Sequence, residues 1–168
     1  GGQSFAEGFF SFEVPQGLPR ALIIRARVDG RPPWETGEVR SAEATRGFHS
    51  VTLSLRSVAR TAEVLTGIFG YTLVGREGNR HRYVTTAIEG AATVDLLDIS
   101  DGPRAINAGG TVHHVAFRVR NEEILMQYRK KVIQHGLAIT PKIDRNYFFS
   151  LYFREPGGVL FELATDNP

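Results

Sequence analysis

The chain has 168 residues, of which 42% are apolar and 23% are charged, and it carries a formal net charge of +2. These values are typical of one globular domain that is long enough to bury a core. The charges form no basic tract and no basic and aromatic pattern, so nucleic acid is not expected as a partner. No apolar run reaches the ~18 residues of a membrane-spanning helix. The absence of cysteine excludes disulfides and thiolate chemistry, and it fits a cytoplasmic location.

The N-terminal part is predicted to hold a β-hairpin followed by a linker. Residues 9–14 and 21–28 are rich in strand formers and flank a turn at 15–19 that contains proline and glycine. Residues 29–46 contain several glycines and prolines, which indicates a linker, and Trp34 is expected to pack this linker against a core.

Two similar blocks follow, and each is predicted to have the order β-α-β-β-β. In the first block the predicted strands are 48–55, 71–76, 80–87 and 93–99, and the helix is 57–69. In the second block the predicted strands are 112–119, 137–139, 147–153 and 159–164, and the helix runs from the cap Asn121 to His135. The prediction is therefore an α+β domain over residues 46–168, built from modules at 46–106 and 107–168.

The two blocks also match in sequence, which identifies an internal repeat. The stretch 48–53 lies over 112–117, so that Ser50 stands at the position of His114, and Asp95 stands at that of Glu162. A repeat of roughly 65 residues with amphipathic halves argues that two units pair to bury their sheets. The turn at 15–17 matches the turn at 156–158, which puts Ala21 at the position of Glu162. We interpret residues 1–45 as the tail of an upstream module plus a Pro-rich linker, and the chain as a fragment or shortened form of a longer repeat protein.

One carboxylate, Glu162, stands among the apolar residues of the last strand. A buried carboxylate is costly unless it is paired, hydrogen-bonded or bound to a metal. Because strand side chains alternate between faces, Glu162 lies opposite the face of Phe161, and His114 lies opposite the face of Phe117. A histidine and a carboxylate on neighbouring strands of one concave sheet are two-thirds of the triad that holds Fe(II) in oxygenases.

The same alternation assigns the other polar residues. The inward face is predicted to carry His114, Glu162, Tyr152, Arg154, Asp95 and Ser50. His113 and His49 fall on the helix side, which favours a structural role for both. His114 is either a ligand or a hydrogen-bonded core residue, and Asp95 is either a ligand or an acid beside a turn.

These residues carry a resemblance to a known family. The span from Arg46 to Asp166 resembles the vicinal-oxygen-chelate superfamily, which includes glyoxalase I, bleomycin-resistance proteins and type I extradiol dioxygenases. The resemblance implies paired βαβββ modules that form a curved mixed sheet around a metal cup. The pattern from Leu151 to Glu162 is similar to the C-terminal signature of the extradiol enzymes, in which the final Glu is an iron ligand. That signature also implies His114 as a metal ligand and Tyr152 as a catalytic residue.

A narrower resemblance points to one group within the superfamily. The stretches 31–34, 46–49, 110–117 and 152–166 look like the C-terminal half of bacterial hydroquinone-type ring-cleaving dioxygenases. The implied function is a metal-dependent, extradiol-type dioxygenase that takes O2 and an aromatic diol such as a hydroquinone or a catechol. The implied metal is Fe(II), with Zn, Ni or Mn as alternatives.

The chain departs from the extradiol pattern in two places. The signature has a histidine shortly before Leu151, where this chain has Ile143-Asp144-Arg145, and Ser50 is a poor ligand at the first-strand position of the earlier repeat. In the longer relatives the second histidine is expected to come from the first module of the N-terminal half. The third metal ligand is therefore not identified, and Asp95 and His49 remain as candidates.

Two other functions stay open at this point. One is a glyoxalase I-like lyase, in which Asp95 would supply a further carboxylate ligand. The other is a small-molecule-binding module without catalysis. For either function, a chain that holds two modules and part of a third has unpaired sheet surface, and this predicts a homodimer.

Overall fold

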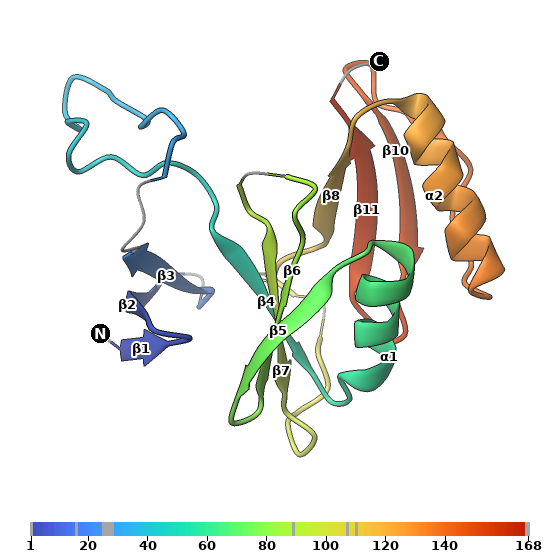
Figure 1. The fold of residues 1–168 in the computed structure, drawn as a ribbon, viewed down its shortest axis with the longest axis horizontal. Helices are drawn as coiled ribbons and strands as arrows, with labels where there is room; N and C mark the ends of the chain where they lie inside the picture. Colours follow the sequence, from blue (N-terminus) through green and yellow to red (C-terminus); the bar gives the residue numbers. More distant parts are fainter. Residues whose placement is uncertain are drawn as a thin grey trace. The chain divides into compact units, whose positions relative to one another are not determined.

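The computed structural model of the chain describes residues 2–15, 17–24, 29–88, 90–106, 108–109 and 111–166 (Figure 1). The chain divides into two compact units. Unit 1 joins Gly1–Ser54 to Tyr71–Leu97, and unit 2 joins Leu55–Gly70 to Asp98–Pro168.

Unit 2 contains a four-stranded mixed sheet with helix α2 beside it (Figure 1). The strands, in their order across the sheet, are β8 (Val115–Val119), β11 (Leu160–Thr165), β10 (Phe149–Arg154) and β9 (Ile143–Asp144). β8 and β11 run parallel, and the other two pairs are antiparallel. Helix α2 (Glu122–Gln134) begins at the cap Asn121, whose side chain accepts a hydrogen bond from the backbone N–H of Ile124.

The helix-facing side of this sheet is apolar and buried. Val119, Leu125, Leu151 and Leu163 form its core cluster, and none is more than 5% exposed. Because β10 and β11 alternate their side chains, burial of Leu151 and Leu163 on this side turns the next residues, Tyr152 and Glu162, to the other side. The packing of α2 thus fixes the face on which the candidate site lies.

The helix predicted at 57–69 forms in two parts, and both belong to unit 2. They are α1 (Ala59–Glu63) and a π-helical turn, η1 (Val64–Ile68). Phe69 follows directly and stacks on Phe117, with the ring centroids 4.5 Å apart.

Unit 1 contains two sheets. The four-stranded sheet has the order β4 (Ser50–Leu55), β7 (Thr93–Asp98), β6 (Arg80–Val84) and β5 (Thr72–Glu77). The three-stranded antiparallel sheet consists of β1 (Gly2–Ser4), β2 (Glu7–Glu13) and β3 (Pro19–Ile24). The two sheets are joined by polar contacts, because Ser4 Oγ and the Phe5 N–H both donate to the carboxylate of Glu77.

The predicted α+β class and the β-α-β-β-β order of both blocks are confirmed, with local differences. Of the strand predicted at 137–139, only Ile139 makes a bridge, to Phe153, and the strand lies instead at Ile143–Asp144. The reason is that Pro141 has no N–H with which to continue a ladder. The prediction that Trp34 packs against a core was wrong, because its side chain is 67% exposed.

Residues 25–28, at the end of the strand predicted at 21–28, lie outside the described residues. Among the helices that the structure describes, none is long and apolar enough to cross a membrane.

Candidate metal and catalytic site

The hairpin of β10 and β11 carries two of the predicted site residues. Tyr152 lies directly opposite Glu162 in the antiparallel pairing, and Ala116 of β8 lies opposite Glu162 on its other side. His114 immediately precedes β8, two residues before Ala116. Strand alternation therefore puts Tyr152 and Glu162 on one face of the sheet, and His114, at the entrance to β8, reaches Glu162 on that face.

Glu162 is at the centre of this cluster, and its side chain is only 5% exposed. His114 Nε2 lies 2.8 Å from Glu162 Oε2, and the hydroxyl of Tyr152 donates to Oε1 at 2.5 Å. In the described part of the chain, the carboxylate forms no ion pair with a lysine or an arginine. A buried carboxylate that is held only by a histidine and a phenol is suited to receive a cation.

The cluster includes two residues whose placement the sequence did not predict. Arg145 Nη2 donates to the Tyr152 hydroxyl at 3.2 Å, and His113 Nδ1 lies 3.0 Å from His114 Nδ1. His113 was assigned to the helix side by extending strand alternation to it, but β8 begins only at Val115. For Arg145 a signal did exist, because it stands in the short window where the extradiol signature has a histidine.

Arg154, also predicted to face inward, does not join the cluster. It is exposed, and its Nη1 donates to the carbonyl of Gly158, within the turn that connects β10 to β11. Arg154 is the last residue of β10 and pairs with Leu160, so its long side chain can reach the neighbouring turn.

The same turn is held by a second buried carboxylate. Glu155 is 2% exposed, and it accepts hydrogen bonds from Thr61 Oγ1 at 2.6 Å and from the N–H groups of Gly157 and Val159, each at 2.7 Å. These bonds satisfy the carboxylate inside the protein and fix the turn. The relative position of Tyr152 and Glu162 depends on this turn, because it sets the register of the hairpin.

We expect Gly157→Ala to destabilise the protein by about 1–3 kcal/mol, because it overpacks this turn. A Cβ at Gly157 would lie 2.5 Å from Thr61 Oγ1 and 2.8 Å from Glu155 Oε1. Urea unfolding measures the change, and Gly37→Ala is the matched control because a Cβ there meets no atom within 4 Å. Equal unfolding midpoints for the two variants would contradict the role given to the turn.

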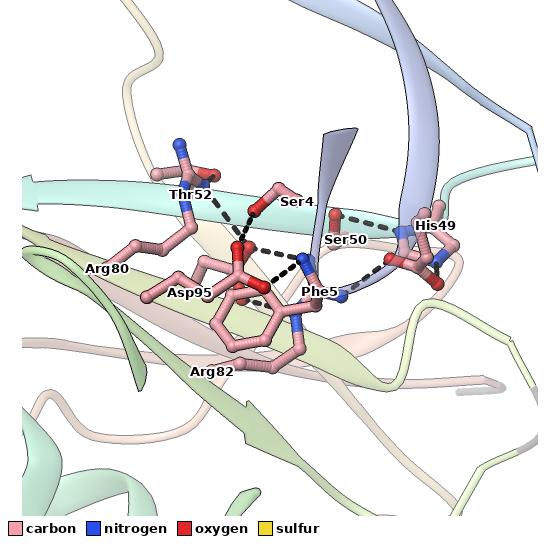
Figure 2. A network of polar contacts seen from close by, with 10 residues as sticks. Ser4, Phe5, His49, Ser50, Thr52, Arg80, Arg82 and Asp95 are labelled. Carbon is pink, nitrogen blue, oxygen red and sulfur yellow. Dashed lines mark hydrogen bonds and ion pairs between the residues drawn. The ribbon is translucent and has the colours of Figure 1, made fainter. Parts of the chain in front are cut away.

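The two candidates for a third ligand, Asp95 and His49, belong to unit 1 and have partners there (Figure 2). Asp95 is 2% exposed, and it is held by Arg80 and by Arg82, whose Nε and Nη2 contact the two carboxylate oxygens at 2.8 and 2.9 Å. His49 Nε2 lies 3.1 Å from Glu7 Oε1, and its Nδ1 lies 3.0 Å from Ser50 Oγ. The structure thus gives each of these residues a role in a polar network.

Arg82 connects the two halves of this network. It donates to Asp95 and also, through Nη1, to Glu7 Oε2 at 2.5 Å. The hydrogen bond to Asp95 is the largest cause of the raised pKa of Arg82, and the bond to Glu7 adds to it against the opposing effect of burial. A cavity of about 260 Å³ lies beside the network and is lined by residues that include Glu7, Arg31, His49 and Arg82.

Arg82 stands directly opposite Asp95 in the pairing of β6 with β7, just as Tyr152 stands opposite Glu162. The pair β6–β7 in unit 1 and the pair β10–β11 in unit 2 therefore share one arrangement, in which a carboxylate faces a polar side chain across the strands, but the polar partners differ. In unit 1 guanidinium groups neutralise the carboxylate, whereas in unit 2 the carboxylate is paired with a histidine and a phenol.

We expect Asp95→Asn to cost about 3–5 kcal/mol of folding stability, because it leaves Arg82 half-buried without its main counter-charge. Metal content should stay unchanged, since we place no ligand at Asp95. Thermal unfolding and metal analysis of the same sample measure both, with the exposed Asp101→Asn as the control. Loss of metal without loss of stability would return Asp95 to the list of ligands.

His114 and Glu162 fit a divalent metal ion as two members of its ligand set. Neighbouring ligands with bonds of about 2.1 Å lie about 3 Å apart, and the 2.8 Å between His114 Nε2 and Glu162 Oε2 agrees with that spacing. Among the described residues, no group of three or more His, Cys, Asp or Glu side chains is arranged to hold a metal. His114 and Glu162 thus match two of the three protein ligands of a facial triad.

Known proteins resemble the chain in sequence. A sequence model of the Glyoxalase/Bleomycin resistance protein/Dioxygenase superfamily matches residues 47–163. MhqO of Bacillus subtilis (strain 168), named "Putative ring-cleaving dioxygenase", is 36% identical over an aligned length of 168 residues, and the match covers 99% of this chain and 52% of MhqO. The Chlorohydroquinone/hydroquinone 1,2-dioxygenase of Sphingobium indicum is 34% identical, over 97% of this chain and 52% of that enzyme. The chain therefore spans about half the length of these curated relatives.

Solved structures agree with the sequence comparison. A crystal structure named as that of a putative dioxygenase from Bacillus subtilis superposes with a TM-score of 0.91 at 37% identity, over 99% of this chain and 53% of its own. A lactoylglutathione lyase from Agrobacterium tumefaciens, at 17% identity and a TM-score of 0.57 over 72% of this chain, shares the fold alone. By fold, by sequence and by the match over residues 47–163, the chain belongs to the glyoxalase/bleomycin resistance protein/dioxygenase superfamily.

Proposed function

We propose that the protein carrying this chain is a metal-dependent ring-cleaving dioxygenase that acts on an aromatic diol, such as a hydroquinone or a catechol, with O2. The observation that carries the proposal is the buried carboxylate of Glu162, shared by His114 and Tyr152 on one face of a sheet. The names of the relatives support the reaction type, since they include ring-cleaving dioxygenases and a hydroquinone 1,2-dioxygenase.

In this proposal His114 and Glu162 hold the metal. Fe(II) is the expected ion, and Zn, Ni or Mn are the alternatives. When bound, the metal supplies Lewis-acid and template chemistry, because it brings the diol and O2 together and polarises them. The third protein ligand is not identified in this proposal, since the two candidates from the sequence, Asp95 and His49, have polar partners of their own.

Tyr152 is the proposed acid and base. Its hydroxyl donates to Glu162 Oε1 and accepts a hydrogen bond from Arg145 Nη2, so the phenol oxygen is held at a fixed place beside the proposed metal ligands. A phenol in this position can pass a proton to or from a substrate hydroxyl. Arg145 would orient the phenol through this hydrogen bond.

Among the described residues of unit 1, no contact favours a glyoxalase-type lyase. That reaction would use Asp95 as a further carboxylate ligand, but the Asp95 carboxylate is held by Arg80 and Arg82. A binding module without catalysis would not need the pairing of Tyr152 with Glu162. We therefore retain the dioxygenase as the proposed activity.

The module boundaries at 46–106 and 107–168, the homodimer and the cytoplasmic location remain predictions from the sequence. Multi-angle light scattering checks the dimer, for which twice the chain mass of 18.6 kDa is expected. A monodisperse species of the single chain mass would count against it.

The activity is tested by oxygen uptake with hydroquinone and with catechol, after anaerobic loading of the protein with Fe(II). Uptake in step with ring cleavage is expected for the wild type and not for His114→Ala. Turnover of a methylglyoxal–thiol adduct by the Zn or Ni form, without oxygen uptake, would overturn the proposal in favour of the lyase.

A further inference from the structure

The cavity of unit 1 is lined by none of the residues of the proposed metal site in unit 2. Its volume is about 260 Å³, whereas a cavity of about 150 Å³ is enough to hold benzene. Part of its wall is apolar, formed by Val84, Ala91 and Ala92, and another part is charged and includes Arg31 and Arg82. A cavity with both kinds of wall suits a small molecule that has an apolar body and a polar end.

Arg31 is fixed in place by charge and by shape. Its Nε and Nη2 donate to the carboxylate of Asp29 at 3.0 and 2.6 Å, and its Nη1 donates to the carbonyl of Phe48 at 3.0 Å. Two glycines leave room for the guanidinium, because a Cβ would lie 2.9 Å from Nη1 at Gly47 and 2.7 Å from it at Gly90. The guanidinium therefore occupies a preformed slot at the cavity.

Arg82 is fixed in a similar way. Its Nε and Nη2 donate to Asp95, its Nη1 donates to Glu7, and its Cζ lies 4.2 Å from the ring centroid of Phe5 (Figure 2). In the contacts that the structure describes, each terminal nitrogen of Arg31 and of Arg82 uses one of its two hydrogens. The second hydrogens are therefore available to bind an anion in the cavity.

The turn that places Glu7 and Phe5 in this network has a strained backbone. Ser4 pairs with Glu7, so Phe5 and Ala6 are the two central residues of the β1–β2 turn, and their φ angles are 49° and 60°. Residues other than glycine and asparagine avoid this left-handed region. The turn is held in it by Ser4 Oγ and the Phe5 N–H, which donate to Glu77 at 3.1 and 2.6 Å. Strain of this kind is found at ligand-binding sites, where it holds side chains ready for the ligand.

The charged groups of the network have a positive excess. Arg46 belongs to it, because its Nη1 donates to the backbone carbonyl of Arg31. Among the described residues, the network consists of four arginines and three carboxylates, which are Arg31, Arg46, Arg80, Arg82, Glu7, Asp29 and Asp95. The planar fork of a guanidinium matches the two oxygens of a carboxylate. The polar end of a ligand in this cavity should therefore be an anion.

We propose that the cavity of unit 1 is a second ligand site, which binds a small organic acid through its carboxylate. The carboxylate takes the available hydrogens of Arg31 and Arg82, and the apolar body of the acid lies against the apolar part of the wall. Inorganic phosphate would leave that part of the wall without a partner. Glu7 competes with the ligand, because its carboxylate already binds Arg82 Nη1. This inference does not depend on the proposed dioxygenase activity.

Isothermal titration of the full chain with benzoate tests the site, since benzoate joins one carboxylate to one compact apolar ring. We expect benzamide, the uncharged analogue, to bind at least about ten-fold more weakly. Arg31→Gln should weaken benzoate binding by about ten-fold or more, because it removes charge-assisted hydrogen bonds. The matched control is Arg40→Gln, which should change nothing, because the side chain of Arg40 lies in the same linker and is 82% exposed.

Two further variants separate a binding role from a merely structural one. Glu7→Gln should tighten benzoate binding by about three-fold or more, because it removes the competing negative charge and keeps the size of the side chain. Gly90→Ala should weaken binding, because the new Cβ would displace the guanidinium of Arg31 from its slot. Gly37→Ala is its matched control, since a Cβ there meets no atom within 4 Å.

His114→Ala separates this site from the proposed metal site and should leave benzoate binding unchanged. Loss of binding in His114→Ala, with full binding in Arg31→Gln, would overturn the proposal, because benzoate would then bind at the metal site. No binding of benzoate at millimolar concentration would also overturn it. Binding of inorganic phosphate as tight as that of benzoate would overturn the assignment to an organic acid.

Discussion

Tyr152→Phe is expected to lower the kcat of ring cleavage by about 100-fold to 10,000-fold, the range that loss of a general acid or base gives. The substitution removes only the hydroxyl that donates to Glu162 Oε1 and accepts from Arg145. The ring stays, and so does its edge-on contact with His114, whose ring centroid lies 5.8 Å away. Metal content and the Tm should therefore change little.

Tyr147→Phe is the matched control, because the side chain of Tyr147 is 81% exposed and has no part in the proposed mechanism. The pH profile of kcat separates chemistry from structure: loss of a proton-transfer group changes its shape, whereas a loss of packing lowers it evenly. A variant of Tyr152 that keeps full turnover would remove this residue from the mechanism.

Glu162→Gln is expected to weaken metal binding by at least about 100-fold and to abolish ring cleavage, since it replaces an anionic ligand with a neutral amide of the same size. The side chain is nearly fully buried, and its two oxygens meet His114 and Tyr152. Isothermal titration with Fe(II) under anaerobic conditions, together with oxygen uptake, measures the two effects.

Glu123→Gln serves as the control, because that carboxylate is exposed on α2. If the Glu162 variant bound iron as tightly as the wild type, the site would have to lie elsewhere in the chain.

The repeat and the strand alternation were enough to predict most of the fold. They placed Glu162 and Tyr152 on one face and His114 beside them, because burial of Leu151 and Leu163 under α2 leaves only the opposite face for polar residues. They also predicted the α+β class, since the switch between periods of two and 3.6 is visible along each block.

The partners of the polar residues could not be predicted in the same way. Asp95 was considered as a ligand because of its repeat position, but the choice between a metal and Arg82 depends on a cross-strand neighbour whose register the sequence does not fix. Arg145 directly follows β9, where no periodicity applies, so its place in the extradiol window is a signal for the position but not for its contact with Tyr152. Trp34 is a similar case, because an aromatic residue in a linker has no pattern that tells packing from exposure.

If His114 and Glu162 hold the metal, the metal content of the purified protein should depend on His114. Metal is quantified by mass spectrometry in protein purified anaerobically without chelators, for the wild type, His114→Ala and His49→Ala side by side. We expect iron in the wild type and in His49→Ala, and its loss in His114→Ala. Iron that persists in His114→Ala and disappears in His49→Ala would show that these ligands are wrong and that the metal lies in unit 1.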